Sequence, residues 1–169
     1  YVNRKYKTVA IISENTEYAQ GLREVFVAQA EKNGIRIVND ETFQENTVDF
    51  RTLLLKVKNA HPDLIFINPQ SGAGVARIAT QARQLNITAT FAGINYTGPD
   101  VLAAGSAVEG MIFAVAPGLA SEGKGSEMLA NYKARYGVEP NYPYVAGAAY
   151  DDVYLLKQGI ESSGDDSMS

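Results

Sequence analysis

The stretch KTVAIISENTEYAQGL, residues 7–22, decides the fold. Its apolar run from Val9 to Ile12 is typical of a strand that is buried on both faces. Ser13 to Thr16 then supply turn and helix-cap side chains, so a helix is predicted from near Glu17. The apolar residues of that helix recur at helical spacing: Leu22, Val25, Phe26 and Ala30. The stretch therefore predicts a strand, a polar turn and a helix, which is the start of a β-α-β unit.

The same alternation continues to residue 116 and predicts an α/β layer structure. The further strands are expected at residues 36–43, 64–67, 88–93 and 110–116. The helices between them are expected to place their apolar stripes at residues 50–57, 75–85 and 100–104, with Thr47 or Asp49 as the cap of the first. Residues 64–67 are apolar throughout, which predicts a central strand beside the first one. In such sheets the crevice for ligands lies beyond the carboxyl ends of the strands, so Tyr18 is expected at the rim of a pocket.

The pattern changes after Pro117. A polar spacer at 121–125 precedes two amphipathic helices, expected at 126–136 and 143–162, and no strand follows either of them. Two such helices without a sheet need another surface to cover their apolar faces. We therefore expect a homo-oligomer formed through residues 121–162, or else disorder of that segment.

The composition excludes several classes of protein. The chain has 169 residues, a net charge of −4 and 15 scattered basic residues, which argues against nucleic-acid binding. It has no cysteine, so disulfides and thiolate metal sites are excluded. It also has no apolar run long enough for a membrane span. A soluble α/β protein is the expectation.

Seven segments, in this order along residues 7–156, resemble one known family. They are KTVAIISENTEYAQGL, GIRIV, DFRTLLLKVKNAHPDLIFI, ATQARQLNI, EGMIFAVAP, MLANYKARYGVEP and AYDDVYLL. Together they look like the branched-chain amino-acid (Leu/Ile/Val) type of periplasmic binding protein, the solute receptors of ABC importers.

The resemblance implies a doubly wound parallel five-stranded sheet with helices on both faces, as in a type I binding-protein lobe, plus two C-terminal helices. Residues 1–118 then correspond to the second lobe, and residues 119–169 resemble helices that pack on a first lobe. On this interpretation the chain is a fragment of a two-lobe receptor.

The implied function is the binding of a small solute, an amino acid or a related compound, by closure of two lobes about a hinge. The implied partners are the ligand and the ABC permease, and the implied location is periplasmic or extracellular. No catalytic activity, cofactor or metal is expected. A ligand-sensing domain of a receptor or regulator on the same fold is the alternative, which flanking sequence would distinguish.

An enzyme on this type of sheet is a third hypothesis. It would need a nucleophile and a base at the carboxyl ends of the strands, and no convincing pair stands there. The single histidine, His61, precedes the strand at 64–67 and is therefore expected at the opposite edge.

Three loops carry the ligand-contact residues that the resemblance implies. Tyr18 matches the tyrosine that covers the bound amino acid from the second lobe. Gln70 and Ser71 match the loop of a second ligand contact, which is aromatic in the leucine/isoleucine/valine-binding protein and polar here. The run SGAG at 71–74 offers backbone N–H groups that suit a carboxylate at a helix start.

Asn95 matches the position where amino-acid binders place a glutamate against the ligand ammonium, and Tyr96 beside it is a further candidate. Asparagine has no charge, so it gives no charge-assisted bond to an amine. This departure leaves room for an amide, a carboxylate or another small polar solute. Glu14 and Glu45 are candidates for an acid pair at the crevice, although solvated turn carboxylates are the more common arrangement.

Overall fold

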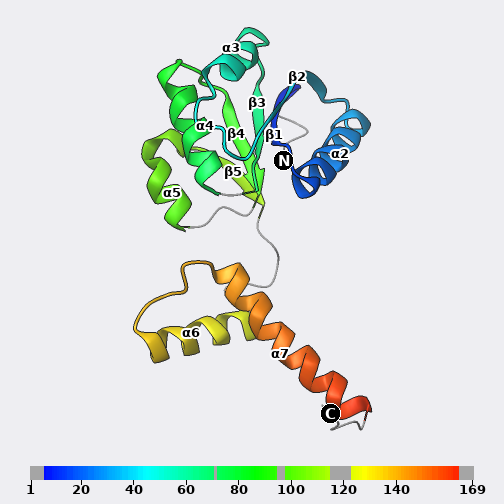
Figure 1. Ribbon diagram of the computed structural model, residues 1–169, viewed down its shortest axis with the longest axis vertical. Helices are drawn as coiled ribbons and strands as arrows, with labels where there is room; N and C mark the ends of the chain where they lie inside the picture. The colour runs from blue at the N-terminus through cyan, green and yellow to red at the C-terminus, as the bar shows by residue number, and fades with distance from the viewer. Residues whose placement is uncertain (1–5, 71, 95–97, 115–122, 164–169) are drawn as a thin grey trace. The chain divides into compact units, whose positions relative to one another are not determined.

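Five parallel strands form one sheet in the order β2-β1-β3-β4-β5. The computed structural model describes residues 6–70, 72–94, 98–114 and 123–163. The strands are β1 Thr8–Glu14, β2 Arg36–Phe43, β3 Leu64–Asn68, β4 Thr90–Ile94 and β5 Ile112–Ala114. The strand expected to be central, β3, is buried along its whole length and lies beside β1, as predicted (Figure 1).

Helices lie on both faces of the sheet, which confirms the predicted fold class (Figure 1). They are α2 Glu17–Lys32, α3 Arg51–Asn59, α4 Gly72–Gln84, α5 Gly98–Ala104 and the 3₁₀ turn η1 Gly105–Val108. The predicted start of α2 is confirmed, because the hydroxyl of Thr16 accepts a hydrogen bond from the Ala19 N–H at 3.2 Å. Its end is also as expected, because the residue after the cap, Gly34, has a φ of +69°.

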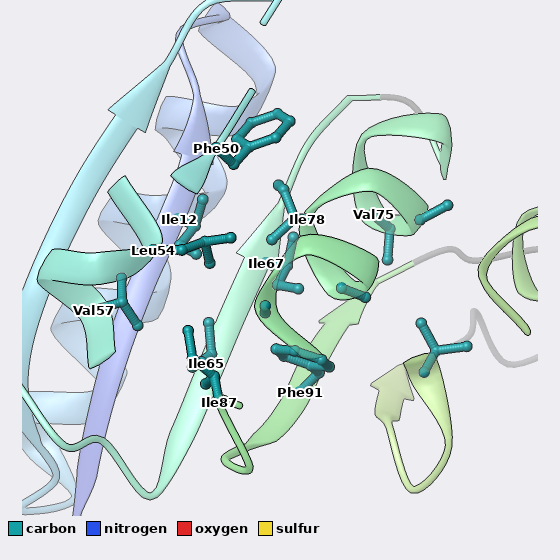
Figure 2. Close-up of a cluster of buried hydrophobic side chains, with 14 of the residues drawn as sticks. Ile12, Phe50, Leu54, Val57, Ile65, Ile67, Val75, Ile78, Ile87 and Phe91 are labelled. Atoms are coloured by element: carbon teal, nitrogen blue, oxygen red, sulfur yellow. The ribbon is translucent and has the colours of Figure 1, made fainter. Parts of the chain in front are cut away.

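The two faces of the sheet bury unequal cores. Ile12, Ile67 and Phe91 of the strands pack with Leu54 of α3 and Ile78 of α4 in the larger cluster (Figure 2). The smaller cluster lies on the α2 side and contains Tyr6, Val9, Ile11, Leu64 and Phe66. There the ring of Phe26 stacks on Phe66 with centroids 4.1 Å apart. Successive residues of β1 thus alternate between two buried faces, as a strand covered on both sides requires.

The start of α3 differs from the prediction. Its N-cap is Phe50, with no side-chain cap bond, and neither Thr47 nor Asp49 takes that position. The Asp49 carboxylate instead accepts the Arg51 N–H at 3.0 Å, and the side chain of Gln81 in α4 accepts the Phe50 N–H at 2.7 Å. A neighbouring helix therefore supplies the acceptor that a local cap would otherwise provide.

The edge strand β5, Ile112–Ala114, begins two residues later than expected. Its start is delayed because Gly110 has a φ of +74° and belongs to the preceding turn. Strand β4 begins at Thr90, two residues later than predicted. The last expected residues of β5, 115–116, lie outside the described part of the chain.

The chain divides into two compact units, Tyr1–Val115 and Ala116–Ser169. Within the second unit, α6 spans Lys124–Tyr136 and α7 spans Pro143–Ser163, so both predicted helices are present. Along α7 the apolar side chains of Val153, Leu155 and Leu156 are exposed. Among the described residues, no helix is both long enough and apolar enough to cross a membrane.

Candidate functional site

The carboxyl ends of β1 and β3 lie side by side, because Ser13 is paired in register with Asn68. Two of the predicted site residues lie in the segments that directly follow these strand ends. Tyr18 lies in the first turn of α2 with 51% of its surface exposed, and Gln70 is exposed just after β3. Both are therefore on the edge of the sheet where open parallel sheets bind ligands. Their role as ligand contacts stays a prediction.

The other three predicted site residues are Ser71, Asn95 and Tyr96. All of them lie outside the described residues. Their ligand roles likewise stay predictions.

A buried polar cluster, not predicted from the sequence, lies beneath this edge. Ser13 and Asn68 are fully buried, and the Asn68 amide nitrogen donates to the Ser13 hydroxyl at 3.3 Å and to the Ala19 carbonyl at 2.6 Å. The Asn68 amide oxygen has no hydrogen-bond partner among the described residues. The sequence does contain a signal for this cluster, because a polar residue stands at or near the end of each of these two apolar strands.

Glu14 fits neither expectation for the two acidic residues, a pair with Glu45 at the crevice or a solvated turn carboxylate. Its exposed fraction is only 3%, whereas Glu45, in the loop after β2, is exposed. The Glu14 carboxylate accepts the backbone N–H of Gln70 at 2.5 Å, and the Gln20 amide donates to the Glu14 carbonyl at 2.8 Å. The N–H of Gln70, just before the SGAG run that was expected to receive a ligand carboxylate, is thus already bound to a protein carboxylate.

The opposite edge of the same two strands carries a second carboxylate tie. Asp63, just before β3, accepts the backbone N–H groups of Lys7 and Thr8, both at 2.9 Å. These bonds lower the pKa of Asp63 below its ordinary value, and the bond from the Lys7 N–H has the largest effect. His61 is exposed nearby with a φ of +48°, at the edge where it was predicted.

A separate apolar hollow of about 400 Å³, including its open mouth, lies between α4, α5 and β5. Val75, Val101, Met111 and Phe113 line it, and Asp100 is the charged residue among its described lining. Within the described residues, no group of three or more His, Cys, Asp or Glu side chains could hold a metal ion. At the carboxyl edge of the sheet, the polar groups that converge among the described residues are those near Tyr18 and Gln70.

Comparison with known proteins gives the family. The family model described as periplasmic binding protein matches residues 1–168. The chain belongs to the periplasmic binding protein family. The match agrees with the resemblance noted in seven segments of the sequence.

Curated members of the periplasmic binding protein family are moderately similar to the chain. It is 26% identical over 166 residues to the leucine-, isoleucine-, valine-, threonine- and alanine-binding protein of Pseudomonas aeruginosa, covering 95% of this chain and 43% of that protein. It is 29% identical over 167 residues to the Leu/Ile/Val-binding protein BraC3 of Rhizobium johnstonii, covering 96% and 44%. The chain thus spans less than half the length of these relatives.

Solved structures of periplasmic binding proteins share the fold. The leucine-binding protein LivK of Thermotoga maritima matches with a TM-score of 0.85 and 27% identity, covering 98% of this chain and 47% of that one. LivJ of Streptococcus pneumoniae, a branched-chain amino acid transporter substrate-binding protein solved with isoleucine, matches with a TM-score of 0.78 and 28% identity, covering 95% and 47%.

Proposed function

We propose that the chain is part of an extracytoplasmic solute receptor of an ABC importer, in which it supplies one half of a ligand site. The observation that carries this proposal is the position of Tyr18 and Gln70 on the adjacent carboxyl ends of β1 and β3, in a chain of the periplasmic binding protein family. A half-exposed tyrosine suits this role, because its ring packs on an apolar side chain while its hydroxyl forms a hydrogen bond.

The proposed ligand is a small amino acid or a related amide or carboxylate. Relatives are named for binding leucine, isoleucine and valine, which supports this class. Ser71, Asn95 and Tyr96 complete the proposed set of contacts with Tyr18 and Gln70. The uncharged side chain at Asn95 weakens the case for a free ammonium group at that point.

The proposed mechanism is closure of two lobes on the ligand, with the permease recognising the closed form. Residues 1–118 form the second lobe in this proposal, and residues 119–169 pack on the first. The protein then acts in the periplasm or outside the cell and binds its ligand without chemical turnover. A clamp of this kind gains its full affinity only when both lobes contact the ligand.

Calorimetric titration with leucine, isoleucine and valine tests the proposal. The isolated chain is expected to bind no more tightly than about 1 mM, near −4 kcal/mol. A chimera joins the chain to the part of the Pseudomonas aeruginosa relative that it does not match. The chimera is expected to bind at least about a hundredfold more tightly.

Two further measurements sharpen this test. In the chimera, Tyr18→Ala is expected to weaken binding by roughly tenfold, whereas Val25→Ala, an exposed residue of the same helix, leaves it unchanged. A folded chimera that binds none of these amino acids, their amides or small carboxylates contradicts the proposed ligand class. Micromolar binding by the isolated chain contradicts the two-lobe mechanism.

A further inference from the structure

Two buried side chains cross between β1 and β3 at the candidate edge. Glu14, the last residue of β1, accepts the N–H of Gln70 in the loop that follows β3. Asn68, the last residue of β3, donates to the carbonyl of Ala19 in the helix that follows β1. The last residue of each strand is therefore hydrogen-bonded to the segment that follows the other strand.

The environment of Glu14 makes its bond to the loop important. A buried carboxylate is unfavourable unless it is hydrogen-bonded or paired with a cation. None of the ion pairs formed by the described residues includes Glu14. The N–H of Gln70, just before the amino terminus of α4, is thus the hydrogen-bond donor that the structure gives this carboxylate.

The Asn68 amide is oriented by α2. The amide nitrogen donates hydrogen bonds to Ala19 and Ser13, while the buried amide oxygen has no partner within the described residues. Ala19 is fully buried and directly follows Tyr18. The bond from Asn68 therefore fixes the backbone that carries the exposed Tyr18 ring.

We propose that Glu14 and Asn68 are positioning residues that hold the Tyr18 turn and the Gln70 loop in one fixed geometry before ligand arrives. The inference rests on the proposed function, which assigns ligand contacts to Tyr18 and Gln70. Fixing two contact segments in advance reduces the ordering cost of binding, so loss of either tie weakens affinity beyond any loss of stability.

Amide hydrogen exchange of the ¹⁵N-labelled chain tests the Glu14 tie. Glu14→Ala is expected to accelerate exchange at the Gln70 amide by roughly tenfold, whereas Glu14→Gln, which keeps an acceptor oxygen, stays within about threefold of wild type. Asp63→Ala is the matched control, because it removes a carboxylate tie to Lys7 and Thr8 at the opposite edge of the same strands. It is expected to accelerate exchange at those two amides and not at Gln70. Equal effects of the Glu14→Ala and Asp63→Ala variants at Gln70 overturn the proposal.

A leucine titration of the chimera described above, followed by NMR, tests the Asn68 tie. Asn68→Ala is expected to increase the mobility of the Tyr18 ring and to weaken leucine binding several-fold, and to add no further loss in a Tyr18→Ala background. An Asn68→Ala variant with the ring mobility and affinity of the Asp63→Ala control overturns the proposal. Absence of any response of the folded chimera to leucine, isoleucine, valine, their amides or small carboxylates refutes the ligand class instead. Exchange at Gln70 and mobility at Tyr18 still decide whether the ties position the two segments.

Discussion

Asp63 illustrates how one exposed carboxylate contributes to the joining of β1 and β3. It accepts two backbone N–H groups at the start of β1, and these bonds favour its charged form. Because the pKa of Asp63 is lower in the folded than in the unfolded chain, its contribution to stability is complete above the unfolded pKa. That contribution is lost as the pH falls through the folded pKa.

The lowered pKa of Asp63 leads to a prediction for the variant Asp63→Asn. The difference in free energy of unfolding between wild type and the variant should be constant above about pH 5 and should shrink towards zero near about pH 2. Urea titrations followed by circular dichroism measure it at each pH. Glu45→Gln, at an exposed carboxylate after β2, serves as control. A difference that grows as the pH falls contradicts the assigned direction.

At the scale of the element, the first turn of α2 depends on one hydroxyl. Thr16 caps the helix through the Ala19 N–H, so Thr16→Ala should lower the free energy of unfolding by about 1 kcal/mol. Thr16→Ser keeps the acceptor and should retain most of that stability. Urea unfolding of both variants measures the difference, and equal losses in the two variants indicate that the hydroxyl bond contributes nothing.

The elements themselves were predictable because hydrophobic periodicity is a local signal. The alternation in residues 7–22 and the wholly apolar run at 64–67 were enough to predict β1, α2 and the central place of β3. Strand polarity then placed Tyr18 at the carboxyl edge. None of these predictions requires information about contacts between residues that are distant in the sequence.

The errors arose where distant residues meet. Glu14 was expected in solvent, yet its acceptor role depends on Gln70, 56 positions away along the chain. The local cap expected for α3 is replaced by a bond from Phe50 to Gln81, 31 positions away. The Ser13–Asn68 contact follows from strand register, which the sequence alone leaves open.

At the scale of the whole molecule, the family match extends through both compact units, because it runs from residue 1 to residue 168. The relatives are more than twice as long as the matched region. The assignment of residues 119–169 to another lobe stays a proposal, and the exposure of apolar side chains along α7 is the feature that makes it testable.

That exposure predicts self-association of the isolated chain. Val153, Leu156 and Ile160 recur at helical spacing on α7 with exposed fractions of 64%, 68% and 48%, and such a stripe normally marks a surface that another element covers. Light scattering of the chain is expected to show a dimer or a larger species.

The double variant Val153→Lys with Leu156→Lys tests this prediction, because lysine preserves helix propensity while it removes the apolar stripe. This variant should shift the protein towards the monomer, whereas the control Lys157→Gln should not. A monomer at all concentrations, with the α7 amides protected from exchange, contradicts the prediction. In that case the stripe would have to be covered within the same chain.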